Sequence, residues 1–127
     1  MGMAGQEFMP RILVVDDEPL IAMMVEEWLN ELKCKTVGPA HSVTNALALI
    51  DSDQVDAAIL DVSLGTEESY PIADALWANR IPFALATGRS ATDVEIRFKD
   101  VPLLLKPFDF DSMKFVVNKL INGKARF

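Results

Sequence analysis

The chain has 127 residues, of which 50% are apolar and 24% charged, a composition that suits one globular domain and excludes a disordered chain. Its 19 aspartates and glutamates outnumber its 12 lysines and arginines, which gives a net charge of -7. Because this charge repels phosphate backbones and anionic lipid, neither nucleic acid nor a membrane is expected as a partner.

The first ten residues are interpreted as a tail. Residues 1–10 lack the uninterrupted apolar stretch of a signal peptide, and no apolar run of the chain approaches the roughly 20 residues that cross a bilayer. The domain is expected to occupy residues 11–127. The one cysteine, Cys34, can form neither an internal disulfide nor a CxxC metal site, and it is interpreted as a small buried hydrophobe. These features predict a cytoplasmic protein.

Five short apolar runs are predicted to be strands. They are RILVV (11–15), KTVGP (35–39), VDAAIL (55–60), PFALAT (82–87) and VPLLL (101–105). Unbroken apolar runs with several β-branched residues are typical of strands that are covered on both faces, as in a parallel sheet.

Segments of helical period lie between and after these strands. The residues suited to open or cap the five expected helices are Pro19, Ser42, Pro71, Ser90 and Asp109. The first helix carries a long apolar stripe from Ile21 to Leu32. The fourth is expected to be the weakest, because it relies on the capping-box-like spacing of Ser90 and Asp93.

This alternation predicts an α/β fold, a doubly wound five-stranded parallel sheet with five helices on its two faces. In such sheets the working residues lie just beyond the carboxyl ends of the strands. Those positions hold acids, a hydroxyl and an ammonium, namely Asp16, Asp17, Asp61, Thr87 and Lys106. We therefore expect these side chains to converge at one edge of the sheet.

Three carboxylates at one edge favour a bound divalent cation. Carboxylates about 4 Å apart repel by roughly 4 kcal/mol per pair at an effective dielectric near 20, and a cation or protonation removes this cost. Oxygen ligands without histidine or thiolate select a hard ion, and Mg²⁺ is favoured. An aspartate in such a group can accept a phosphoryl group when the metal and Lys106 neutralise the developing charge, and Thr87 can hydrogen-bond that group.

Four segments carry these residues, in the order VVDDE (14–18), ILDVSL (59–64), ATG (86–88) and LLLKPF (103–108). With this order and spacing, residues 11–122 resemble the receiver domains of two-component response regulators. The resemblance implies a flavodoxin-like sheet of strand order 2-1-3-4-5. It also implies a cis peptide bond between Lys106 and Pro107, which is plausible because proline lowers the cis penalty.

The resemblance also assigns roles to the residues. It implies that Asp61 is phosphorylated by a histidine kinase or a histidine phosphotransfer protein, assisted by Lys106 and Thr87. It implies a Mg²⁺ cofactor held by Asp17 and Asp61 directly, by Asp16 through water, and by the backbone carbonyl of Ser63. His41 is expected to be exposed and is given no role.

Two positions depart from the usual pattern of the family. Leu103 stands where an aromatic switch residue is usual, and Gly65 replaces the usual proline four residues after the phosphoacceptor. The segment PFALATGRS (82–90) is similar to the Phe-Ala-Thr-Gly variant group of receivers. These departures predict a switching mechanism other than the usual coupling of a threonine to an aromatic residue.

The chain ends one helix after Lys106, which predicts a stand-alone receiver that signals through a partner protein and is not an enzyme in the ordinary sense. One alternative is a phosphate sink that only drains a kinase. The other is a small phosphatase or nucleotide-binding enzyme on a similar sheet, but no P-loop, GxGxxG or DxDxT segment supports it.

Overall fold

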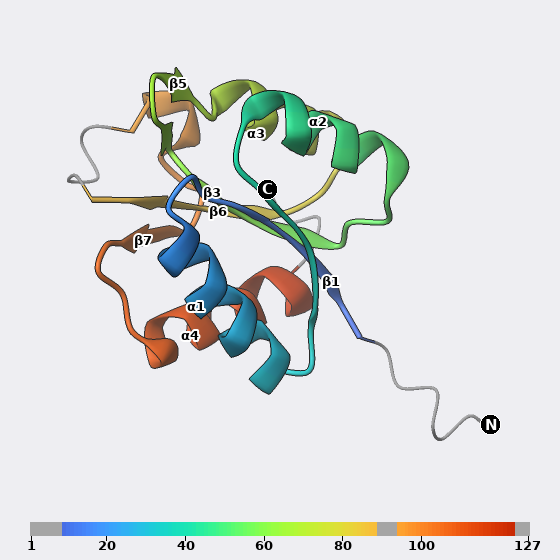
Figure 1. The fold of residues 1–127 in the computed structure, drawn as a ribbon, viewed down its shortest axis with the longest axis vertical. Helices are drawn as coiled ribbons and strands as arrows, with labels where there is room; N and C mark the ends of the chain where they lie inside the picture. The colour runs from blue at the N-terminus through green and yellow to red at the C-terminus, as the bar shows by residue number, and fades with distance from the viewer. Residues whose placement is uncertain (1–8, 89–93, 124–127) are drawn as a thin grey trace.

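The computed structural model describes residues 9–88 and 94–123. Within them, parallel strands form a five-stranded sheet in the order β2-β1-β3-β6-β7, with helices on both faces (Figure 1). The strands are β1 (Arg11–Val15), β2 (Lys35–Ala40), β3 (Ala57–Asp61), β6 (Phe83–Thr87) and β7 (Leu103–Leu105). The order matches the predicted 2-1-3-4-5 when these five strands are counted along the chain.

Four α-helices lie in the described part of the chain. Helices α1 (Pro19–Glu31) and α4 (Phe110–Asn122) cover one face of the sheet, and α2 (Val43–Ser52) and α3 (Tyr70–Ala78) cover the other (Figure 1). The predicted caps are confirmed for two of them, since Ser42 Oγ accepts from the Asn45 N–H at 3.1 Å and Asp109 Oδ1 accepts from the Ser112 N–H at 2.8 Å. None of the described helices is long and apolar enough to span a bilayer.

The prediction of five helices is wrong for the described residues. Between β6 and β7 they contain only a short 3₁₀-helix, η2 (Ile96–Phe98), while Ser90 and Asp93 lie outside the described residues. Ile96 is 81% exposed, and Phe98, at 1%, is the buried residue of η2. A short helix is stabilised mainly by packing, and η2 offers the core one side chain.

A small hairpin that was not predicted follows β3. Its strands β4 (Ser63–Leu64) and β5 (Glu67–Glu68) pair in antiparallel fashion around a turn in which Gly65 has a φ of 66°. The hairpin contacts the start of α2, where the Val43 N–H donates to Glu67 Oε1 at 3.3 Å.

The sheet separates two apolar cores. In β1, Leu13 and Val15 pack on the side of α2 and α3, and Ile12 and Val14 pack on the side of α1 and α4. This alternation between two buried faces explains why the strand is an unbroken apolar run. Cys34 is buried in the second core, as predicted, and burial raises the pKa of its thiol.

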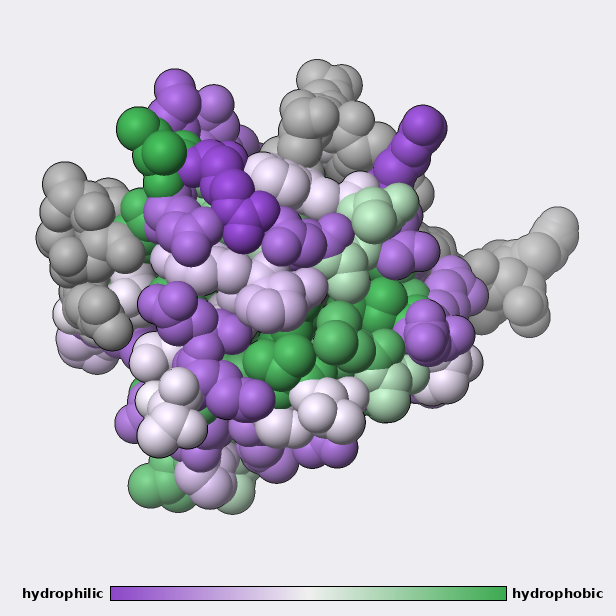
Figure 2. All heavy atoms as spheres, turned by 90° about the horizontal axis from the view of Figure 1, so that it is seen from above, coloured by the Kyte–Doolittle hydropathy of each residue, from purple (hydrophilic) through white to green (hydrophobic). Residues whose placement is uncertain are grey.

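The layer of α2 and α3 presents a mixed outer surface, in which a hydrophobic area lies among hydrophilic residues (Figure 2). Helix α2 fully buries only Ala46, and Leu47, Leu49 and Ile50 are half-buried. Helices α2 and α3 therefore cover this face of the sheet but leave part of their own apolar surface exposed.

Replacing Gly38 by alanine is expected to destabilise the fold. Gly38 has a φ of 93°, and a Cβ there would lie 2.7 Å from the Ala40 amide nitrogen and 3.2 Å from the Val14 carbonyl oxygen. Both contacts are with backbone, so Gly38→Ala should lower the free energy of unfolding in urea by more than about 1 kcal/mol. Gly88→Ala is the control, because a Cβ at Gly88 meets nothing within 4 Å. Equal losses in the two variants would contradict the prediction.

Candidate functional site

Polar residues meet at the carboxyl ends of the parallel strands, as the sequence predicts. Asp16 follows β1, Asp61 ends β3, Thr87 ends β6 and Lys106 follows β7. Asp16, Asp61 and Thr87 are buried although they are polar, at 4%, 6% and 5% exposure. Buried polar groups require partners, and the arrangement around Lys106 supplies them for both carboxylates.

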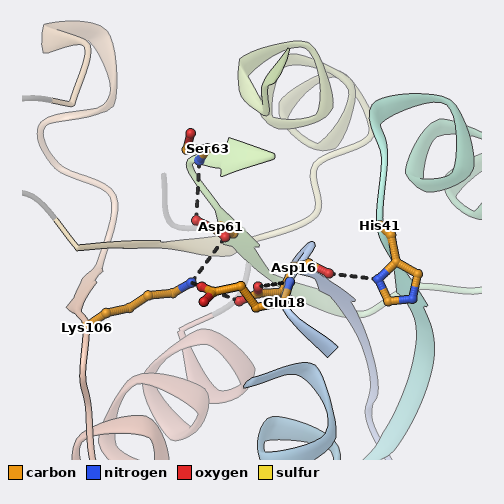
Figure 3. Close-up of polar contacts among 6 residues, drawn as sticks. All are labelled: Asp16, Glu18, His41, Asp61, Ser63 and Lys106. Carbon is orange, nitrogen blue, oxygen red and sulfur yellow. Dashed lines mark hydrogen bonds and ion pairs between the residues drawn. The ribbon is translucent and has the colours of Figure 1, made fainter. Parts of the chain in front are cut away.

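The Lys106 ammonium lies at the centre of the site (Figure 3). Its Nζ donates to Asp16 Oδ2, to Glu18 Oε1 and to Asp61 Oδ2, each at 3.1 Å. The peptide bond between Lys106 and Pro107 is cis, as the resemblance implies. The backbone also anchors this strand end, since the Lys106 N–H donates to the Thr87 carbonyl at 2.8 Å.

Four carboxylates lie close together at this site. Asp16, Asp17, Glu18 and Asp61 each place a carboxylate oxygen within 4.8 Å of the others. Asp17 is exposed, and its Oδ2 lies 3.6 Å from the position that a Cβ of Gly65 would take. Gly65 therefore lies next to the Asp17 carboxylate.

For both Asp61 and Lys106, burial and the charge of the other residue act on the pKa in opposite directions. Burial, to which the Asp16 charge adds, raises the pKa of Asp61 to about 6, although the Lys106 ammonium acts to lower it. Burial also acts to lower the pKa of Lys106, but its hydrogen bonds and charge interactions with Asp16 and Asp61 outweigh burial and raise it. Lys106 therefore stays charged near neutral pH, whereas Asp61 takes up a proton at a higher pH than an ordinary aspartate does.

The donor set fits a hard divalent cation. All four acids offer oxygen atoms, and one ammonium leaves most of their negative charge uncompensated. The predicted backbone ligand lies in the same loop, because the Ser63 N–H donates to Asp61 Oδ1 at 3.3 Å. Ser63 is thus held beside the predicted phosphoacceptor, at the start of the β4–β5 hairpin.

Two residues at the site had no predicted role. Glu18 belongs to the VVDDE segment, but its contact with Lys106 depends on a rotamer that no sequence pattern specifies. His41 is exposed, as expected, and its Nδ1 lies 2.9 Å from the Asp16 carbonyl oxygen (Figure 3). Since a carbonyl oxygen can only accept, the ring donates to the backbone of a predicted metal ligand.

Comparison with known proteins assigns this site to a family. The family model of the response regulator receiver domain matches residues 12–118. The chain belongs to the response regulator receiver domains. Curated relatives include the transcriptional regulatory protein TcrA of Mycobacterium tuberculosis, 32% identical over 81% of this chain, and the heme response regulator HssR of Staphylococcus saprophyticus, 28% identical over 89%. This receiver domain spans 42% of TcrA and 52% of HssR.

Solved receiver structures share its fold. SdrG from Sphingomonas melonis has a TM-score of 0.80 and 47% identity, and the match covers 89% of this chain and 97% of SdrG. The response regulator TrrA from Thermotoga maritima, solved in complex with Mg²⁺ and beryllofluoride, has a TM-score of 0.78 and 30% identity, with 88% and 99% covered. Receiver domains bind Mg²⁺ at an acidic site, and this receiver domain has a cluster of four acidic side chains at the carboxyl edge of its sheet.

Proposed function

We propose that this receiver domain is a phosphoacceptor switch. A carboxylate oxygen of Asp61 attacks the phosphorus of a phosphohistidine on a histidine kinase or phosphotransfer protein. The P–O bond forms as the P–N bond breaks, and the histidine nitrogen leaves with the electron pair. The observation that supports this proposal most is the place of Asp61, buried at the end of central strand β3 with the Lys106 ammonium 3.1 Å from its carboxylate.

The neighbouring residues have distinct roles in this proposal. Lys106 neutralises charge on the incoming phosphoryl oxygens, and the Thr87 hydroxyl donates to one of them after transfer. Asp17, Asp61 and the Ser63 carbonyl would hold Mg²⁺ directly, and Asp16 would help to hold it through water. When bound, Mg²⁺ supplies positive charge that offsets the developing negative charge of the transferred group.

We further propose that the phosphorylated domain acts by binding a partner protein in the cytoplasm, without contacting nucleic acid or membrane itself. The net charge of -7 supports the expectation that the domain contacts neither nucleic acid nor membrane, because this charge opposes association with anionic polymers and lipids. The site holds phosphate covalently and is not expected to turn over a substrate as an enzyme does.

A small phosphodonor tests the central claim. The protein is incubated with acetyl phosphate, with and without Mg²⁺, and intact-mass spectrometry counts the phosphoryl groups that it retains. One Mg²⁺-dependent group per chain is expected. Continuous hydrolysis of the donor without a retained group would instead indicate a phosphatase. A phosphate sink is distinguished in a second step, by the lack of any protein that binds only the beryllofluoride-treated form.

Mg²⁺ is expected to stabilise this receiver domain, and Asp17→Ala should remove most of that effect. Filling the acidic cluster removes carboxylate repulsion, so the melting temperature should rise with Mg²⁺ concentration. Asp17 is exposed, so its replacement need not disturb the core. Calorimetry with and without Mg²⁺ measures the change, and Asp51→Ala on the exposed face of α2 is the matched control. A metal-dependent rise that persists in full in Asp17→Ala would exclude Asp17 as a main ligand.

A further inference from the structure

The Glu18 side chain is not used to cap the helix that it precedes. Glu18 is the N-cap residue of α1, yet its side chain makes no cap hydrogen bond. Its Oε1 instead lies 3.1 Å from Lys106 Nζ, across the site (Figure 3). The Glu18 backbone N–H donates to Asp16 Oδ1 at 2.9 Å, which places the residue beside the site. A role in helix capping therefore does not explain the position of this carboxylate.

All the N–H donors of the Lys106 ammonium have acceptors in this arrangement. An ammonium group carries three N–H donors, and Lys106 directs them at Asp16, Glu18 and Asp61. The three partners differ in accessibility, because the Asp16 and Asp61 side chains are 6% and 7% exposed whereas that of Glu18 is 60% exposed. If one partner is released, Glu18 regains water at the least cost.

We infer that Glu18 is a latch that holds Lys106 in the resting state and slows phosphorylation of Asp61. This inference rests on the proposed function. As Asp61 bonds to phosphorus and the donor's leaving group departs with its electron pair, new phosphoryl oxygens require an N–H from Lys106. Glu18 must then release the ammonium. Glu18 is accordingly a positioning residue that acts through Lys106.

Two substitutions distinguish the effect of the length of the Glu18 side chain from the effect of its charge. Glu18→Ala removes both, whereas Glu18→Asp keeps the charge on a side chain that is one methylene shorter. Both variants should take up the phosphoryl group of acetyl phosphate about two- to fivefold faster than the wild-type chain. This factor corresponds to the interaction free energy of one exposed ion pair. The measurement is the initial rate of labelling by intact-mass spectrometry over a series of Mg²⁺ concentrations.

The control is Glu68→Ala, which removes an exposed acid from the neighbouring hairpin and should keep the wild-type rate. Equal acceleration by Glu68→Ala and Glu18→Ala, with none by Glu18→Asp, would show a general charge effect and overturn the latch. A higher Mg²⁺ requirement in Glu18→Ala would make Glu18 a metal ligand, which also overturns it. Slower labelling of the Glu18 variants would do the same. A wild-type chain that takes up no phosphoryl group would overturn the proposed function itself, a result distinct from each of these.

Discussion

Replacing Asp61 by asparagine is expected to reduce Mg²⁺-dependent phosphorylation to background. An amide oxygen lacks the negative charge that makes a carboxylate a nucleophile, and no other described acid combines the features of Asp61. Asp61 ends a central strand, is 6% exposed and accepts from Lys106 Nζ at 3.1 Å. Labelling with acetyl phosphate followed by mass spectrometry of the intact chain measures the loss.

Asp51→Asn provides the control for this experiment. Asp51 is an exposed aspartate on α2, and its replacement changes the net charge by the same amount. The control should be labelled at the wild-type yield. If Asp61→Asn still takes up one Mg²⁺-dependent phosphoryl group at full yield, another residue is the acceptor and the proposed chemistry is wrong.

The positions of the predicted site residues follow from topology alone. Parallel strands end at the same edge of a sheet, so residues directly after the apolar runs meet there however distant they are in sequence. Asp16 and Lys106 are 90 positions apart in the sequence, yet Lys106 Nζ lies 3.1 Å from Asp16 Oδ2. The covered faces were predictable because buried parallel strands are unbroken apolar runs, whereas the strand order was implied by the resemblance to the receiver family.

Other features depend on contacts that the apolar pattern does not report. The strands of the β4–β5 hairpin are two residues long, too short for any period to be recognised. The segment before β7 was expected to be helical, but Phe98 stacks on Tyr70 at a ring-centroid distance of 5.3 Å and Arg97 pairs with Asp74 of α3. These tertiary contacts attach the segment to α3 in a 3₁₀ turn.

Leu103, which stands where the family usually has an aromatic switch residue, is half-buried in the structure. Leu103 pairs with Leu85 of β6 and packs against the core beneath α2 and α3. Without a ring or hydroxyl it cannot hydrogen-bond toward Thr87. Membership of the Phe-Ala-Thr-Gly variant group stays a prediction, as does a switching mechanism that does not use Leu103.

Ionisation of Asp61 is expected to destabilise the metal-free protein as the pH rises from about 4 to about 6, and Asp61→Asn should remove this contribution. The folded-state pKa of Asp61 is about 6, against an ordinary value of 3.8, chiefly because the carboxyl is buried. Between these values the folded chain retains a proton that the unfolded chain has released. Raising the pH therefore favours unfolding, by up to about 3 kcal/mol once the pH exceeds the folded-state pKa.

Urea unfolding in the presence of a chelator, at pH values from 4 to 8, measures this dependence. Asparagine does not titrate, so the curve for Asp61→Asn should lack the part of the slope that Asp61 contributes, and the variant should be more stable than the wild-type chain above pH 6. Asp51→Asn should retain the wild-type slope. Saturating Mg²⁺ should reduce the difference between wild type and Asp61→Asn above pH 6, because the cation stabilises the ionised carboxylate that burial disfavours. Parallel curves for wild type and Asp61→Asn without metal would show that Asp61 is ionised in the folded chain as readily as in the unfolded one, and burial would then not govern the acidity of the site.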